Sequence, residues 1–484
     1  MKKIIFLVIL YVSIFGHSYA QKKSKEFNTD PAVFIKEFST YIENSNRSDL
    51  LEFMKAFNKK WKNEEITTNE KSDIINMINI MRKRKMNIPY QYDYLLALKS
   101  FRNSALDFEQ YEDWHNMAVR ILETAKRGKH TEFKNFIKNT GSLFESRAIY
   151  VSKARSWIIE EVEIQFKYDK DSIPFIHIPN TKLTGFTNKD SIRIYNTTGD
   201  YYPLTFEWKG RGGQLNWEKV FIDPTEVYCE LPEYDINVQK SEFKVDSVQL
   251  HYTTIFNKPL YGSLHDKLKS NVKAEKNTYP RFISYEKSLE ISSITKGVKY
   301  VGGFSLIGPK IIGSGDLDNP ARLYFYKQDS LFIFAKSKNF SIKMGEKVVS
   351  DRAQISVYIR LDSSQHKDSI FHAGAKLRLN IDSNEVQIMR GEHGIQRTAL
   401  HNTYHQYDMY VEQINWKLGS DNIDFSMLSE SAGPAIYESF DYYKDNRFTQ
   451  WKSTLDYNPL SNIKRFCERE AFMDSIAAID IARS

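Results

Sequence analysis

Two histidines, His401 and His405, have the i, i+4 spacing that places two imidazoles on one face of a helix. Glu392, His393 and Asp408 lie near them in the sequence and could complete a zinc site. The segment lacks the glutamate that a metalloprotease helix of the HExxH type uses as its base. The competing interpretation is that the two histidines form ordinary hydrogen bonds in a loop, and we adopt this interpretation. We therefore expect no resident cofactor.

Four aromatic residues near the middle of the chain could stack on sugars, because flat ring faces match the C–H faces of a pyranose. They are Tyr201, Tyr202, Trp208 and Trp217. Aromatic residues in strands are more often part of the core, so glycan binding and core packing both stay open for this set.

Other motifs for catalysis are weak. The run Gly210-Arg211-Gly212-Gly213 lacks the spacing of either common phosphate-binding loop, so a tight turn between strands explains its glycines. The sequence has no GxSxG elbow, and neither cysteine lies in a nucleophile motif. Carboxylate pairs for glycoside hydrolysis are assembled in three dimensions and stay open. On balance we expect a protein that is not an enzyme.

The N-terminus has the features of a secretory signal peptide over residues 1–20. Two lysines at positions 2 and 3 precede an apolar run over residues 4–15 and small residues at positions 18 and 20. We expect cleavage after Ala20, which makes Gln21 the first mature residue. Residues 21–28, directly after that point, contain no cysteine to carry a lipid anchor, and no later apolar run reaches about 18 residues. The expected location is the periplasm or the cell surface, with no transmembrane segment after cleavage.

The net charge argues against nucleic acid as a partner. The formal charge of +7 falls to +5 when Lys2 and Lys3 are removed with the signal peptide, an excess too small to favour nucleic acid.

Cys229 and Cys467 both lie among apolar residues, which predicts two buried thiols. An exported protein could also join them in a disulfide.

Residues 30–147 are predicted to be helical throughout. Capping-box spacing occurs at Asp49 and Glu52 and again at Thr67 and Glu70, each followed by apolar residues at helical intervals. Five or six short helices with brief connections indicate a helical bundle or a small array of helical hairpins.

From about residue 148 the apolar period changes from 3.6 to 2, which predicts half-buried strands. The clearest runs alternate over residues 353–361 and 375–381, and the second ends in a hairpin turn at Asp382-Ser383-Asn384. The predicted fold class is therefore a multidomain α+β protein whose helical bundle precedes antiparallel β-rich modules of sandwich, jelly-roll or open-solenoid type.

The domain boundaries follow from composition. Residues 269–280 are rich in Lys and Asn, so we place a first β-rich domain at 148–268 and a second at 281–430. Residues 431–484 are expected to be mostly helical. Because their apolar pattern runs to Ser484 without a stop signal, the chain is expected to be part of a longer protein.

A family resemblance rests on two segments. The run from Tyr201 to Glu218, with Trp208-Lys209-Gly210-Arg211-Gly212-Gly213, and the segment Tyr300-Val301-Gly302-Gly303-Phe304 resemble large exported proteins of Bacteroidota that have no established function. This resemblance implies a Gram-negative envelope and a longer parent chain, and it transfers no catalytic residues. The strands from Ala321 to Arg390 are also similar in pattern to the jelly-roll folds of lipopolysaccharide-transport (OstA-type) proteins.

Together these features predict an exported, non-enzymatic envelope protein that binds or scaffolds other envelope components. Envelope proteins, glycans or lipids are the expected partners. One alternative is a lipid or glycolipid carrier with a jelly-roll interior, and another is a glycan hydrolase or metallohydrolase.

Overall fold

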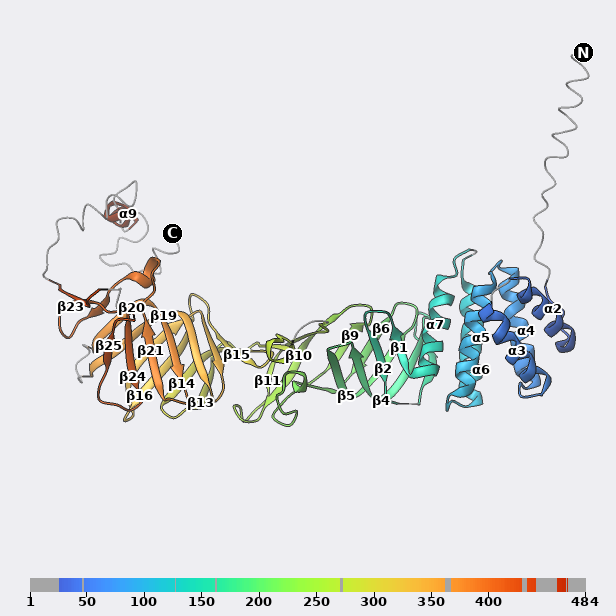
Figure 1. Cartoon of the computed structure of the whole chain (residues 1–484), viewed down its shortest axis with the longest axis horizontal. Coiled ribbons are helices and arrows are strands. Elements are labelled where there is room, and N and C mark those ends of the chain that lie inside the picture. Colours follow the sequence, from blue (N-terminus) through green and yellow to red (C-terminus); the bar gives the residue numbers. More distant parts are fainter. Residues whose placement is uncertain are drawn as a thin grey trace, which may run out of the picture. The chain divides into compact units, whose positions relative to one another are not determined.

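The computed structural model describes most of the chain, namely residues 26–45, 48–126, 128–161, 163–269, 273–361, 367–428, 433–440, 459–466 and 468. The predicted signal peptide, Cys467 and most of the predicted C-terminal helical segment lie outside the described residues. Figure 1 shows the helices first in the sequence and the strands after them, so the predicted α+β order is confirmed.

The helical region consists of six α-helices. They are α2 (Pro31–Glu43), α3 (Ser48–Lys62), α4 (Thr68–Lys83), α5 (Ile88–Asn103), α6 (Phe108–Thr124) and α7 (Thr131–Ser146). Their apolar faces form one core that includes the fully buried Phe34, Phe38 and Trp114. A further short helix, α9 (Pro459–Phe466), lies near the C-terminus.

Capping interactions set where several helices begin. The Thr67 hydroxyl accepts the Glu70 N–H and the Glu70 carboxylate accepts the Thr67 N–H, so the capping box predicted there is confirmed. Asp107 and Gln110 form a second box at the start of α6. The side chain of Asp30 caps α2, whose first residue is a proline.

The strands begin directly after α7. Those up to residue 267 are β1 (Ala148–Val151), β2 (Ser156–Ile159), β3 (Gln165–Tyr168), β4 (Pro174–Phe186), β5 (Ser191–Tyr202), β6 (Glu207–Arg211), β7 (Gln214–Asn216), β8 (Val227–Glu230), β9 (Glu233–Asn237), β10 (Glu242–Tyr252) and β11 (Leu260–Lys267).

The later strands are β12 (Arg281–Ser284), β13 (Leu289–Thr295), β14 (Val298–Ile307), β15 (Lys310–Ser314), β16 (Ala321–Lys327), β17 (Ser330–Ser337), β18 (Asn339–Lys343), β19 (Lys347–Leu361), β20 (Lys367–Asn380), β21 (Glu385–Met389), β22 (Leu400–Asn402), β23 (Tyr407–Tyr410), β24 (Gln413–Lys417), β25 (Asp424–Ser426) and β26 (Ile436–Ser439). Short 3₁₀ turns cover Glu218–Val220, Ala274–Lys276 and Gly394–Arg397.

Long strands hold the first β region together by pairing differently at their two ends. β4 and β5 pair along their length, but β3 joins the start of β4 whereas β2 joins its end. β5 likewise pairs with β7 near its start and with β6 at its end. The ladder therefore divides into two branches that share the long strands.

A β-bulge marks each division. Asn180 in β4, Asn196 in β5 and Ser247 in β10 have positive φ angles of 33°, 53° and 59°. The buried positions of β4 are 174, 176 and 178 before the bulge and 181, 183 and 185 after it. Because the bulge inserts one residue, the same face stays buried while the strand changes partners.

The C-terminal β region is built in the same way around β19 and β20. Their pairing shifts register near Ser350 and Ala353. β17 then pairs with the second half of β19, while β22 and β21 join opposite ends of β20. β21 continues into β24 and β25, and β22 continues into β23 and β26.

The division predicted at residues 269–280 does not separate two sheets, because β11 pairs with β12 across that segment. The described residues form two compact units. The first runs to Ser293 and includes residues 301–315 and 341–344, and the second comprises 294–300, 316–340 and the residues from 345 onward. The start of the predicted C-terminal helical segment holds the strand β26 instead. Among the described helices, none is long and apolar enough to cross a membrane.

Candidate functional site

His401 and His405 lie on a strand and the turn after it, not on a helix. His401 belongs to β22, where its Nδ1 is 2.9 Å from a carboxylate oxygen of Asp408, its cross-strand partner. His405 lies in the turn before β23 and donates its backbone N–H to the side chain of Asn402. The i, i+4 spacing therefore does not place the two imidazoles on one helical face. No group of three or more His, Cys, Asp or Glu side chains gathers into a metal site among the described residues.

The same turn assembles an exposed group of aromatic side chains. The His405 ring stacks on Tyr407 with centroids 5.4 Å apart and meets the edge of Tyr404 at 4.8 Å. Tyr407 in turn contacts Tyr437 of β26 at 5.5 Å. Tyr404 is 44% exposed and Tyr437 49% exposed, so these rings are open to solvent.

Strand β26 carries the outer part of this group. It pairs with β23, and in this register Tyr437 lies opposite the buried Met409 and Ile436 opposite Tyr410. Directly paired residues share a face of the sheet. The face that is buried at Met409 therefore becomes exposed at Tyr437. Ile436, on the other face, is 52% exposed.

The pairing described for β26 is with β23. β26 spans four residues, and its exposed apolar side chains are Ile436 and Tyr437. We call Tyr404, His405, Tyr407, Ile436 and Tyr437 the aromatic edge.

The four aromatic residues predicted as a glycan site are buried instead. Tyr201, Trp208 and Trp217 are 0% exposed and Tyr202 is 8% exposed. Trp208 packs so closely against β5 that a Cβ added to Gly199 would lie 2.2 Å from its ring. Their ring faces contact protein and are not open to a sugar, so core packing is the correct interpretation of this set.

The glycines between β6 and β7 form the predicted tight turn. Gly212 and Gly213 have φ angles of 67° and 109°, a conformation that favours glycine. Gly210 precedes the turn, where a Cβ would lie 2.2 Å from the ring of Tyr234. These glycines serve the packing of the strands.

Two histidine–carboxylate hydrogen bonds on the sheet were not predicted. His177 Nδ1 is 2.7 Å from Asp200, whose other oxygen accepts from Arg211 at 2.6 Å, and His401 pairs with Asp408 as described above. Among the described residues, neither imidazole has a hydrogen bond to a serine or cysteine that could act as a nucleophile. Both pairs join cross-strand neighbours on a sheet face.

Cys229 is a buried thiol on β8, and burial raises its pKa well above the usual range. A thiol with a raised pKa is a poor nucleophile at neutral pH. Its predicted alternative partner Cys467 lies outside the described residues.

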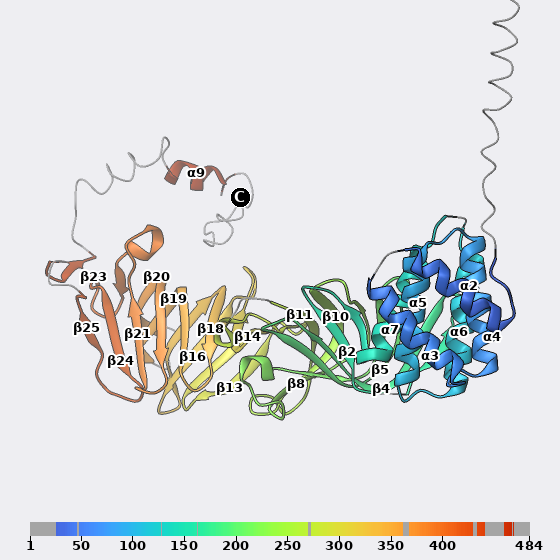
Figure 2. The same cartoon turned by 45° about the vertical axis from the view of Figure 1, so that its right-hand side comes forward.

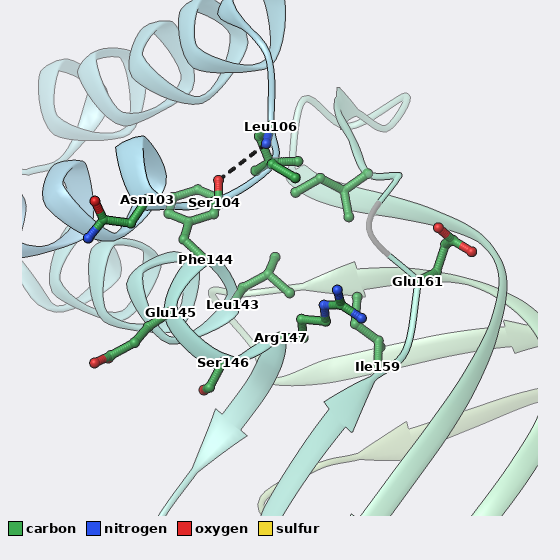
Figure 3. Close-up of a pocket in the computed structure, with 12 residues that line it drawn as sticks. Asn103, Ser104, Leu106, Leu143, Phe144, Glu145, Ser146, Arg147, Ile159 and Glu161 are labelled. Atoms are coloured by element: carbon green, nitrogen blue, oxygen red, sulfur yellow. Dashed lines mark hydrogen bonds between the residues drawn. The ribbon is translucent and has the colours of Figure 1, made fainter.

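A cavity of about 370 Å³ lies where α5 and α7 end beside β2. Figure 3 shows Leu143 and Arg147 pointing into it between Leu106 and Ile159, while Glu145 and Ser146 point away. Arg147 donates to the backbone carbonyl of Glu160 at 2.6 Å, so this cation already has a partner. The cavity therefore lies where the last helix of the helical region, α7, is followed by the first strands.

Comparisons with known proteins give no relatives: no family model, no curated protein and no solved structure matches this chain. The functional argument therefore depends on the residues themselves. The aromatic edge has a signal in the sequence, because residues 401–410 contain two histidines and three tyrosines without the apolar alternation of a core strand.

Proposed function

We propose that this chain is an exported, non-enzymatic protein of a Gram-negative cell envelope, and that it binds another envelope protein through the aromatic edge. The observation that carries the proposal is the exposure of two apolar side chains on strand β26, where Ile436 is 52% and Tyr437 49% exposed beside the ring of Tyr407. Tyrosine is enriched at protein interfaces because it adds a large apolar surface with a polar end.

The exposed side chains favour a protein segment as the partner. Apolar side chains of such a segment can pack on the ring cluster of Tyr437 and Tyr407 and on Ile436. A glycan would use the rings but not the exposed aliphatic side chain of Ile436.

The other functions considered from the sequence have less support. In the first β region the large side chains of Trp157, Trp208 and Trp217 are fully buried. This packing does not favour an acyl chain in that interior. The two histidine–carboxylate pairs lack the additional groups that a hydrolase would need, as described above.

Photo-cross-linking in cells tests the proposal. A photoreactive phenylalanine analogue at Tyr437 is expected to give a discrete adduct with one envelope protein, identified by mass spectrometry. The same analogue at Phe221, which is 78% exposed in the first β region, is the matched control and should give no such adduct. Adducts with glycan alone, or identical products from the two positions, would refute the proposed protein partner.

Export has its own experiment. Mass spectrometry of the protein recovered from the envelope should find an N-terminus at Gln21 or its cyclised form. A chain that is recovered from the cytoplasm and still begins at Met1 would refute the envelope location without testing the aromatic edge.

A further inference from the structure

The helical region has a groove between α3 and α5, which lie side by side in Figures 1 and 2. It encloses about 410 Å³ and is lined by one row of residues from each helix, together with Ile66. It lies far along the sequence from the aromatic edge, and the inference drawn from it does not depend on the proposed function.

The two helices run in the same direction. Near their N-terminal ends, the ring of Phe53 on α3 meets Tyr92 on α5 with centroids 5.3 Å apart. Near their C-terminal ends, Arg102 of α5 donates to the carbonyl of Glu65, just beyond α3. The groove therefore has an N-terminal end and a C-terminal end that both helices share.

The middle of the groove is apolar. Phe57, Leu95 and Leu98 form a buried floor, and Phe53 and Leu96 are half-buried beside the opening. Burying such side chains further is favourable at about 25 cal/mol per Å² of apolar surface. The groove therefore favours an apolar occupant along its length.

The two ends of the groove carry opposite charges. Asp49 and Glu52 lie at the N-terminal end, and Lys60, Lys99 and Arg102 lie at the C-terminal end. Glu52 and Lys60 are eight residues apart on α3, which corresponds to about 12 Å along the helix axis. This distance matches two turns of an occupying helix.

The cations are not equally engaged. Arg102 binds the Glu70 carboxylate at 2.5 Å, and Lys60 lies 4.0 Å from Glu65. Lys99 is exposed and has no ion-pair partner among the described residues. It is therefore the cation most available to an acidic group on a ligand.

An amphipathic helix antiparallel to α3 and α5 matches all of these features. Helices prefer acidic side chains in the first turn and basic ones in the last turn, and antiparallel packing opposes the helix dipoles. Its acidic first turn would meet Lys99 and Lys60, and its basic last turn would meet Asp49 and Glu52. A single fatty-acid chain would use the basic end but place its apolar end against the carboxylates.

We infer that the groove between α3 and α5 binds an amphipathic helix of a partner protein, antiparallel to both helices. Recognition combines an apolar stripe at i, i+3, i+4 and i+7 with a charge order that runs from acidic to basic.

Synthetic peptides test the charge order directly. The probe is a fluorescein-labelled helical peptide of sixteen residues with glutamates in its first turn, a leucine stripe and lysines in its last turn. Fluorescence anisotropy with the full chain should give an affinity about fivefold higher than for a peptide with the same stripe and the charges reversed. A peptide of the same composition with apolar residues at every second position should not bind.

A charge exchange in the protein provides the decisive control. The double variant Glu52→Lys with Lys99→Glu should lose most of the preference for the original peptide, because the new charges at positions 52 and 99 oppose those of Asp49 and Lys60. The matched control exchanges Glu132→Lys with Lys134→Glu on α7, outside the groove, and should leave the preference unchanged. Circular dichroism verifies that each variant remains helical.

The outcomes that overturn the inference are also defined. They are equal affinity for the two peptides, a preference unchanged by the exchange at 52 and 99, or no binding at all. Saturable binding of oleate that Lys99→Glu abolishes, without peptide binding, would instead assign the groove to an anionic lipid.

Discussion

Two sets of aromatic side chains in this protein have opposite environments. The set around Trp208 in the first β region is buried, whereas in the aromatic edge Tyr404 is 44% and Tyr437 49% exposed. The residue types are similar, and Trp208 and Tyr437 both lie on short strands, β6 and β26. The comparison teaches that the position of an aromatic residue in the sheet, more than its residue type, determines whether the side chain stabilises the fold or is available for binding.

The buried set should dominate stability, and Trp208→Ala tests this with the largest expected effect. Its ring is 0% exposed and packs against Gly199, so its removal leaves a cavity that the sheet cannot fill. We expect the free energy of unfolding to fall by about 3–5 kcal/mol, measured by urea denaturation. Phe221→Ala, at a 78% exposed position, is the control and should change it by less than about 0.5 kcal/mol. Equal losses in the two variants would contradict the burial.

A smaller effect is expected at the bulge of β5, which keeps the buried set on one face. Asn196 is exposed and has a φ of 53°, so its role is in the backbone. Asn196→Ala should lower the free energy of unfolding by about 1 kcal/mol, because alanine disfavours the left-handed conformation. Asn196→Gly should be close to neutral in the same urea experiment. If glycine destabilises as much as alanine, lost side-chain contacts would be the cause.

Much of the fold could be predicted from local sequence patterns. Helical spacing and the capping box at Thr67 predict α4, and alternation predicts β19 and β20, because these signals depend on neighbouring residues alone. The bulges were missed although their signal is local: the buried period in β5 slips by one residue at Asn196.

The candidate site was harder to predict, because exposure depends on residues far apart in the sequence. The ring of Trp208 packs on Gly199 because β5 pairs with β6, and this pairing is not visible from the residues around Trp208. Tyr437 meets Tyr407 only because β26 pairs with β23. The histidine spacing at 401 and 405 suggested a helix, but the segment forms a strand and a turn, where i, i+4 has no special meaning.

The contrast between enclosed and open positions also predicts a dependence on pH. His372 of β20 is 1% exposed, its Nδ1 accepts the Gly374 N–H at 3.0 Å, and burial lowers its pKa. The nearby Arg390 guanidinium lowers this pKa further, while the bond to the Thr398 carbonyl opposes the shift. The unfolded chain therefore binds a proton at higher pH than the folded chain does. Stability from this residue is present above the unfolded pKa of about 6.5 and is lost as the pH falls below it.

Urea denaturation at pH 7, 6 and 5 measures this effect. The free energy of unfolding should decrease with falling pH, and His372→Gln should reduce that slope. Part of the slope should remain, because burial also lowers the pKa of His115 and His265. An unchanged slope in the variant would show that His372 is not the group that couples protonation to unfolding.

The smallest effect on stability, and the sharpest separation of the two aromatic sets, is expected for Tyr437→Ala. This ring is 49% exposed and its recorded ring contact is with Tyr407, so its removal creates no cavity. The free energy of unfolding should change by less than about 0.5 kcal/mol. A photoreactive analogue at position 404, also in the aromatic edge, should nevertheless lose most of its adduct with the partner protein when Tyr437 is alanine. A stable variant that keeps the full adduct would show that the exposed ring contributes to neither stability nor binding, which would remove the contrast with Trp208.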